Sequence, residues 1–251
     1  MAERVVVDIL GVCVDNVSEA EALAAIEGFI ESGAAHQVVT VNPEFVVAAQ
    51  RDSEFMSILN EASLALPDGG GLLWAARLLG RPLKTRVTGV DTVQEVAALA
   101  ARRGYRLFLL GAAPDVAEQT AARLVSDHPG LVVAGTYAGS PATEEEDVIV
   151  ARVRAARPHV LFVAYGAPSQ DKWIHRNLER LGAPVAMGVG GAFDFISGAA
   201  RRAPHWMQRL GLEWLHRLCC QPWRWRRMLA LPKFVGLVVW SRLRRSSHTA
   251  Y

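Results

Sequence analysis

Cysteine is scarce in this 251-residue chain. Cys13, Cys219 and Cys220 have neither C-x-x-C spacing nor paired histidines nearby, so the sequence predicts neither a zinc site nor a redox pair. Three cysteines without such a pattern favour a reduced, cytosolic protein over a secreted, disulfide-stabilised one.

Long hydrophobic runs are also absent. Residues 1–20 lack a basic region followed by an uninterrupted apolar run, so we expect no signal peptide. No apolar run approaches the roughly 20 residues that a membrane-spanning helix needs. The longest one near the end, residues 228–240, is interrupted by Pro232 and Lys233. The sequence therefore predicts no transmembrane helix.

Several catalytic motifs are missing as well. There is no Asp-x-Asp and no cluster of His, Cys and carboxylate residues with metal-ligand spacing, which favours a metal-independent site. There is no G-x-S-x-G, so the nucleophile of an α/β-hydrolase is not expected. No P-loop and no good G-x-G-x-x-G are present. We expect no bound metal and no cofactor.

Charge is unevenly distributed along the chain. The formal net charge is only +2, but the segment from Arg201 to the end holds ten Arg and one Lys against a single acid, Glu213. The preceding residues hold 16 basic and 24 acidic side chains. Five of the seven tryptophans also lie in the basic segment. We therefore predict two parts, a catalytic domain over residues 1–198 and a basic, Trp-rich helical appendage over residues 199–251.

The first part has the pattern of an α/β domain. Short continuous apolar runs alternate with helical patterns of 10–15 residues, which is typical of a mostly parallel, Rossmann-like sheet with helices on both faces. Asn42 followed by proline predicts a capped helix start. Thr143-x-x-Glu146 has the form of a capping box, and another helix is expected to begin at Asp91 or Thr92.

Polar side chains follow several of the predicted strands. Asp68 stands between a proline and three glycines, where a ligand can approach the backbone closely, and its carboxylate is a candidate general base. The alternative is that Asp68 only caps the next helix. Thr40 and Asn42 are candidates to face the substrate, although Asn42 is also a plain N-cap. Arg86 lies in a basic loop, where a solvated surface charge is the alternative.

Further strand exits carry glycine turns or polar groups. The turns at Gly111 and Gly190 offer backbone amides that suit a phosphate, although such turns are often only structural. Gln170 and Asp194 also follow predicted strands. Because ligands bind at the carboxyl ends of strands in open α/β sheets, we expect these groups to share one edge.

The appendage mixes Arg, Trp and Leu at roughly helical spacing. Such a composition favours a membrane surface or a lipid phosphate. One alternative is a helical pair packed on the body or on another subunit of a homo-oligomer. Another, a nucleic-acid patch, is less favoured, and we expect no nucleic-acid partner.

The ordered set of motifs resembles the WecG/TagA/CpsF glycosyltransferases (glycosyltransferase family 26), specifically its N-acetylmannosaminyltransferases, over nearly the whole chain. The resemblance rests on TVNPEFV, LPDGGGLLWAARLLG, RVTGVD, LFLLGAAP, YGAPSQDKWI, GVGGAFDFISG and RRAPHWMQRLGLEWLHRL. The one departure is a third glycine at Gly71, where the family commonly has a larger residue.

The resemblance implies transfer of a sugar, N-acetylmannosamine or a related hexose, from a UDP-sugar to a polyprenyl-diphosphate-linked sugar. Such enzymes are inverting and metal-independent, make cell-envelope or exopolysaccharide intermediates such as teichoic acid precursors, and act at the inner face of the cell membrane. Asp68 is then the implied base, Thr40, Asn42 and Arg86 line the pocket, and Gln170 and Asp194 complete it. The appendage is implied to supply arginines to the diphosphate, for which we choose Arg217, Arg224 and Arg227.

Two other classes remain as alternatives. One is an NAD-dependent oxidoreductase on a Rossmann-like sheet, which would need a better nucleotide fingerprint and an acidic ribose-binding residue. The other is a non-catalytic membrane adaptor, which would leave Asp68, Gln170 and Asp194 without a role.

Overall fold

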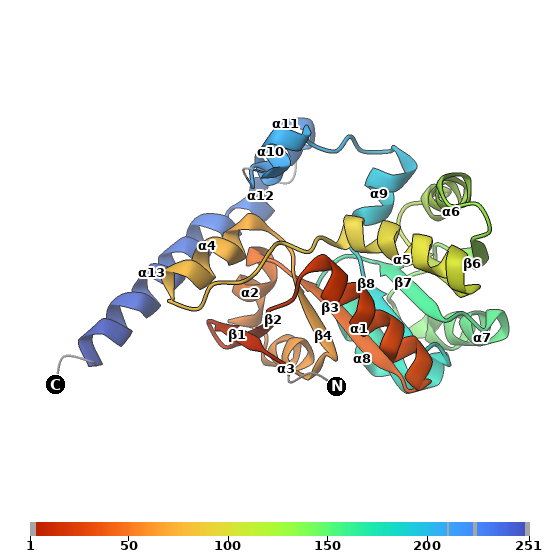
Figure 1. Ribbon diagram of the computed structural model, residues 1–251, viewed down its shortest axis with the longest axis horizontal. Coiled ribbons are helices and arrows are strands. Elements are labelled where there is room, and N and C mark those ends of the chain that lie inside the picture. Colours follow the sequence, from red (N-terminus) through yellow and green to blue (C-terminus); the bar gives the residue numbers. More distant parts are fainter. Residues whose placement is uncertain (1–3, 210, 223–224, 249–251) are drawn as a thin grey trace.

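A six-stranded sheet forms the centre of the protein (Figure 1). The computed structural model describes residues 4–209, 211–222 and 225–248. Neighbouring strands of the sheet are all parallel, in the order β4-β3-β8-β7-β5-β6, which confirms the predicted α/β class. The strands are β3 (His36–Val41), β4 (Leu64–Pro67), β5 (Arg106–Gly111), β6 (Val132–Tyr137), β7 (Val160–Ala164) and β8 (Val185–Gly188).

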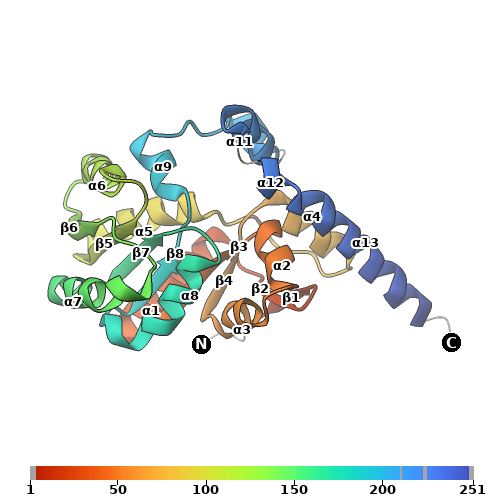
Figure 2. The ribbon, with the colours of Figure 1, turned by 180° about the vertical axis from the view of Figure 1, so that it is seen from behind.

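Helices cover both faces of this sheet (Figures 1 and 2). Successive strand residues alternate between the faces, as Leu107 and Leu109 do on one side and Phe108 and Leu110 on the other. The first face is packed by α1 (Glu19–Ser32), α5 (Gly89–Arg103), α6 (Val116–Asp127) and α9 (Ala192–Ser197). The second is packed by α2 (Pro43–Ala49), α3 (Ser53–Glu61), α7 (Glu146–Ala156) and α8 (Ser169–Leu181).

A separate antiparallel hairpin, β1 (Val6–Ile9) and β2 (Val12–Asp15), packs beside β4. Asp15 at its end is almost fully buried, and it accepts hydrogen bonds from Arg4 Nε at 2.8 Å and from the Ala65 amide at 2.6 Å. A buried carboxylate with both a cationic and an amide donor is well compensated. This contact fixes the hairpin to the edge of the sheet.

The structure confirms some of the predicted helix N-termini and corrects others. The Asn42 side chain accepts from the Phe45 amide at 3.1 Å and caps α2, as predicted. The predicted capping box at Thr143 is wrong: Thr143–Glu145 form a 3₁₀ turn, η1, and α7 has no side-chain cap. Ala142 holds the extended N-cap position there, so Thr143 already lies inside the turn. Helix α5 begins at Gly89, earlier than predicted, because Thr88 caps it.

The C-terminal segment forms helices α10 (His205–Arg209), α11 (Glu213–Cys220), α12 (Trp225–Met228) and α13 (Ala230–His248). Pro232 does not interrupt α13, because it lies in the first turn, where a missing N–H is tolerated. Phe234 and Val238 of α13 are buried against α2 and α4 (Gly70–Leu78). None of the described helices combines the length and the apolar character that crossing a bilayer requires.

The three glycines after Asp68 have distinct packing environments. A Cβ on Gly71 would lie 2.7 Å from Pro43 Cγ, and one on Gly70 would lie 3.2 Å from the Gly211 Cα of the C-terminal segment. Gly69 has a positive φ of 118°, which a side chain rarely adopts. The third glycine therefore lets α4 lie directly against the start of α2.

Gly71→Ala is expected to lower the free energy of unfolding by about 1–3 kcal/mol, because the Pro43 ring is part of a helix start and has little room to move. Gly28→Ala is the matched control: its site in α1 has open space around it, so the same change is expected to raise stability by about 0.5–1 kcal/mol. Urea unfolding of both variants measures the difference. Equal stability of Gly71→Ala and the wild type would contradict this packing account.

Candidate active site

A cavity of about 980 Å³ lies at the carboxyl edge of the sheet. Its walls come from the residues that follow β3, β4, β7 and β8, from the first turn of α5, and from the C-terminal helices. Ligands bind at this edge in open parallel sheets. Eight of the residues proposed from sequence line it: Thr40, Asn42, Asp68, Arg86, Gln170, Gly190, Arg217 and Arg227.

Asp68 directly follows β4 and borders the cavity. Its Oδ2 accepts a hydrogen bond of 3.2 Å from the Gly89 amide, at the N-terminus of α5. Burial raises the pKa of the Asp68 carboxyl to about 6, opposed by the Gly89 hydrogen bond and the charge of Arg86. A carboxyl with a pKa near 6 is still mostly ionised at neutral pH and is a stronger base than a free aspartate.

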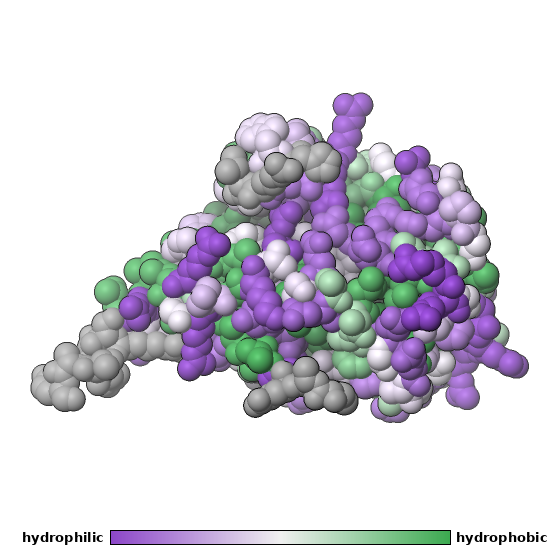
Figure 3. Space-filling view, viewed as in Figure 1, coloured by the Kyte–Doolittle hydropathy of each residue, from purple (hydrophilic) through white to green (hydrophobic). Residues whose placement is uncertain are grey.

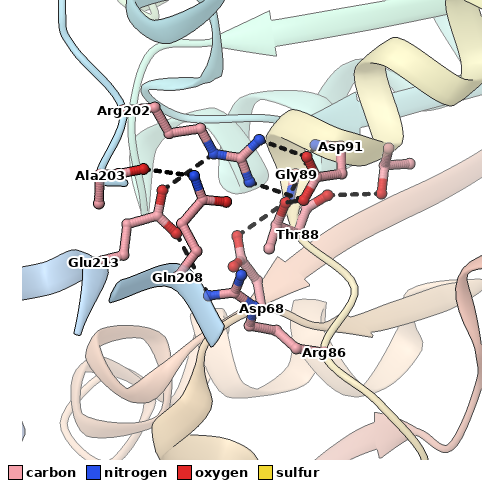
Figure 4. Close-up of polar contacts among 10 residues, drawn as sticks. Asp68, Arg86, Thr88, Gly89, Asp91, Arg202, Ala203, Gln208 and Glu213 are labelled. Atoms are coloured by element: carbon pink, nitrogen blue, oxygen red, sulfur yellow. Dashed lines mark hydrogen bonds and ion pairs between the residues drawn. The ribbon is translucent and has the colours of Figure 1, made fainter. Parts of the chain in front are cut away.

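A chain of ion pairs connects this wall of the cavity to the C-terminal segment (Figure 4). Arg86 Nη1 lies 3.4 Å from Glu213 Oε2, and the other oxygen of Glu213 lies 3.2 Å from Arg202 Nε. Arg202 also binds both carboxylate oxygens of Asp91, which accepts in turn from the Thr88 hydroxyl at 2.6 Å. These side chains come from the loop after α4, from α5 and from the appendage. Arg86 is thus paired inside the cavity and is not a solvated surface charge.

Thr40 and Asn42 each make a structural contact in addition to facing the cavity. The Thr40 hydroxyl donates to the Gly188 carbonyl at 3.1 Å and so joins the ends of β3 and β8. Asn42 uses its oxygen as the cap of α2, which leaves its amide NH₂ as the group able to donate to a ligand. The proposed binding role and the capping role of Asn42 are therefore compatible.

Gln170 is almost fully buried and organises two glycine turns. Its Oε1 accepts from the Gly166 amide at 3.1 Å and from the Gly190 amide at 3.0 Å. A Cβ on Gly188 would collide with the Gln170 side chain, so a glycine is required behind it. Gln170 thus sets the shape of the cavity floor, and the Gly190 amide is occupied by Gln170.

Arg217 of α11 lines the cavity. Its Nε and Nη2 atoms are buried and form no hydrogen bond with any described residue. The guanidinium lies 4.8 Å above the Phe195 ring, and a Cβ on Gly191 would collide with Nη2. Burial lowers the pKa of Arg217, which the nearby Asp194 carboxylate partly offsets. A half-buried guanidinium with two buried nitrogens that make no hydrogen bond is suited to a bound anion such as a phosphate.

The other proposed residues are placed differently. Arg227 lines the cavity but is paired with Glu44, at 2.8 Å. Asp194 faces Arg217 from beside the cavity and is not among the lining residues. Gly111, at the end of β5, is also outside the lining; its φ of 97° and its close approach to Ala164 give it a packing role. Arg224 lies outside the described residues.

Over the described part of the chain, no group of three or more His, Cys, Asp or Glu side chains is arranged to hold a metal ion.

Comparison with known proteins places the chain in a family. Residues 7–248 match the glycosyl transferase WecG/TagA/CpsF family. This protein belongs to that family. It is 37% identical to a Bacillus subtilis N-acetylglucosaminyldiphosphoundecaprenol N-acetyl-beta-D-mannosaminyltransferase over 202 residues, 80% of this chain and 78% of the relative. It is 31% identical to a Staphylococcus aureus protein of the same name over 231 residues, 91% of this chain and 90% of the relative.

Membership of the WecG/TagA/CpsF family identifies the chain as a glycosyltransferase, as the motifs predicted. The match extends through the α/β body and most of the C-terminal helices. It decides in favour of the glycosyltransferase over both alternatives, the oxidoreductase and the non-catalytic adaptor.

Glu213 and Arg202 are charged residues of the cavity wall that sequence reasoning did not identify. Each pairs across more than 100 positions of sequence, with Arg86 and Asp91 respectively. The one available signal was that Glu213 is the sole acid of an otherwise basic segment.

Proposed function

We propose that this WecG/TagA/CpsF glycosyltransferase moves an N-acetylmannosamine-type sugar from UDP to a polyprenyl-diphosphate-linked sugar, with inversion and without a metal. The named relatives transfer N-acetylmannosamine to N-acetylglucosaminyl-diphospho-undecaprenol, which supports the donor sugar and the acceptor. The observation that carries the proposal is that the walls of one cavity hold both a carboxyl of raised pKa, Asp68, and an arginine, Arg217, with two buried nitrogens that make no hydrogen bond.

Asp68 would act as the base. The acceptor hydroxyl oxygen forms a bond to the anomeric carbon of the donor, the bond from that carbon to the UDP oxygen breaks, and the hydroxyl proton passes to Asp68. The Gly89 amide holds Asp68 Oδ2 at 3.2 Å, which keeps one carboxylate oxygen fixed while the other accepts the proton. Displacement in a single step inverts the anomeric configuration.

The departing UDP carries negative charge that must be balanced. Arg217 supports this role because its guanidinium lies beside the glycine turn at Gly190 and Gly191, and its buried Nε and Nη2 are unused donors. Preorganised positive groups in a site that excludes water stabilise developing charge most strongly. Arg227 would contribute only after exchanging Glu44 for the ligand, since the two are paired in this structure.

The pH dependence follows from Asp68. The base is active when it is deprotonated, so kcat/KM is expected to fall as the pH drops through about 6 and to reach a plateau above it. A pH series with saturating acceptor and limiting UDP-sugar measures this limb. A limb near pH 4, the range of an ordinary aspartate, would contradict the proposed environment of the base.

The appendage supports a membrane-surface location. Four of its tryptophans and several aliphatic residues are exposed, and they lie among arginines. Apolar side chains gather over α13 and α4 on one face of the molecule (Figure 3). Interfacial helices combine Trp and Leu with Lys or Arg in this way. Among the described residues of the segment, the exposed large apolar side chains are Trp206, Trp214, Leu215, Trp225, Leu229, Val235, Val239, Trp240 and Leu243.

Point variants test this better than truncation, because deleting the appendage would also remove the buried Phe234 and Val238. The double change Trp225→Ser and Trp240→Ser is expected to lower binding to anionic vesicles about tenfold or more. Val125→Ser is the control, because Val125 is an exposed apolar residue that does not line the cavity. The exposed Trp74 is unsuitable because it lines the cavity. Vesicle sedimentation measures the effect, and unchanged binding of the double variant would contradict a role for these rings.

The proposed function is tested by UDP release from a panel of UDP-sugars, with and without a short-chain polyprenyl-diphosphate-N-acetylglucosamine acceptor, and with and without EDTA. We expect acceptor-dependent release from UDP-N-acetylmannosamine that persists in EDTA. Release with a different sugar alone would change the donor. Loss of release in EDTA, restored by added Mg²⁺, would contradict metal independence.

A further inference from the structure

Glu213 has an unusual position for an acidic residue of the appendage. It is the only acid after residue 200, yet it begins α11 directly above the cavity, with its side chain only 22% exposed. One of its carboxylate oxygens lies 3.4 Å from Arg86 Nη1 and the other lies 3.2 Å from Arg202 Nε. The single negative charge of the segment is therefore directed between two arginines of the active-site wall (Figure 4).

The two arginines depend on Glu213 to different extents. Arg202 has a second and closer partner, because it binds both oxygens of Asp91. Arg86 pairs with Glu213 alone among the described residues, and it makes no ion pair with Asp68 although their charges interact. Removing Glu213 would thus leave Arg202 anchored and would release Arg86.

We propose that Glu213 is a positioning residue of the active site: it draws the Arg86 guanidinium away from Asp68 and keeps that carboxylate free to accept a proton. The inference rests on the proposed role of Asp68 as the base. A carboxylate paired with an arginine becomes a weaker base and is blocked by the guanidinium. The appendage would therefore complete the site from within the same chain.

The charged and polar groups around Asp68 support this. The Gly89 amide and Arg86 stabilise its ionised form, while Glu213 and Asp91 oppose ionisation. Arg202 neutralises Asp91 through two hydrogen bonds, which leaves Glu213 as the carboxylate that balances Arg86. If Glu213 loses its charge, Asp68 becomes the nearest unpaired anion for Arg86.

The test measures the Asp68 pKa directly in the full-length protein, by the ¹³C resonance of its labelled carboxyl, assigned as the signal that disappears in Asp68→Asn. In Glu213→Gln we expect the Asp68 pKa to fall by about one unit. The acid limb of kcat/KM is expected to move to lower pH with it, and the plateau kcat to fall more than the KM for UDP-sugar rises. Glu21→Gln is the control, because it unpairs Lys84, which lies in the same loop as Arg86 but does not line the cavity.

The same substitution in an Arg86→Ala protein separates two effects of Glu213 on Asp68, the positioning of Arg86 and the direct repulsion between the two carboxylates. In Arg86→Ala, the further change Glu213→Gln removes only a like charge, so its effect on the Asp68 pKa is expected to be less than half as large. An equal pKa change in both backgrounds, or no change in either, would overturn the proposal. If Asp68→Asn were active, Asp68 would not be the base and the proposed function would fail. The carboxyl titration in proteins that keep Asp68 would still show separately whether Glu213 holds Arg86 away from it.

Discussion

Asp68→Asn is expected to lower kcat about a thousandfold, because the side-chain amide cannot take up the proton of the acceptor's hydroxyl group. The substitution keeps the size of the side chain, and the asparagine oxygen can still accept from the Gly89 amide. UDP binding, measured by calorimetry, is therefore expected to stay within about threefold of the wild type, equivalent to about 0.7 kcal/mol.

The same variant should be more stable than the wild type at neutral pH. Because the folded-state pKa of Asp68 is raised, its ionised form opposes folding. This penalty is full above about pH 6, declines below it, and disappears only below the ordinary aspartate pKa of 3.8. Removing the charge removes the penalty at all pH values. Asp127→Asn, at an exposed pair with Arg123, is the control for both measurements. Retained kcat in Asp68→Asn would exclude this carboxylate as the base.

Arg217→Met should also lose activity and gain stability. Loss of the buried cation is expected to lower kcat about a hundredfold, because the charge of departing UDP is no longer balanced. The ligand-free protein should unfold at a higher temperature, since an unpartnered guanidinium gives way to an apolar chain over the Phe195 ring.

Arg123→Met provides the comparison for Arg217→Met, because it removes an exposed arginine from a surface pair. We expect it to change kcat and the unfolding temperature little. Differential scanning calorimetry with and without UDP adds a further check: UDP should raise the unfolding temperature of the wild type much more than that of Arg217→Met. Equal stabilisation of both by UDP would contradict a contact between Arg217 and the diphosphate.

The sheet was predictable from the sequence because buried parallel strands leave a clear local pattern. The runs that became β3, β5 and β7 are continuous and apolar, and the turns after them carry glycine or capping residues. Asn42 was predictable as a cap for the same local reason. Thr143 was not, because Ala142 takes the extended N-cap position, and the capping-box pattern does not encode that backbone conformation.

The cavity wall formed by the appendage was beyond local reasoning. Arg86 and Glu213 are 127 positions apart, and only the folded chain brings them together. Local sequence also could not distinguish the C-terminal arginines, because Arg217 and Arg227 lie in similar basic, Trp-rich sequence. In the structure, two buried nitrogens of Arg217 make no hydrogen bond, whereas Arg227 is paired with Glu44. A charge count located the segment but could not tell these side chains apart.

The C-terminal segment contacts the α/β body in two ways. The appendage is joined to the body by apolar contacts at Phe234 and Val238 and by the ion pairs of Arg202 and Glu213. The ion pairs meet at the wall that holds Asp68. A displacement of the appendage would therefore act directly on the groups around Asp68, without a separate transmitting element.

The anomeric configuration of the product tests the central claim most directly. If Asp68 is a base and the acceptor displaces UDP in one step, an α-linked UDP-sugar must give a β-linked product. The one-bond C1–H1 coupling constant of the purified lipid-linked disaccharide, made with ¹³C-labelled donor, distinguishes the two anomers. We predict the β product. An α product would require a covalent sugar–enzyme intermediate or a front-face reaction, and would contradict the role assigned here to Asp68.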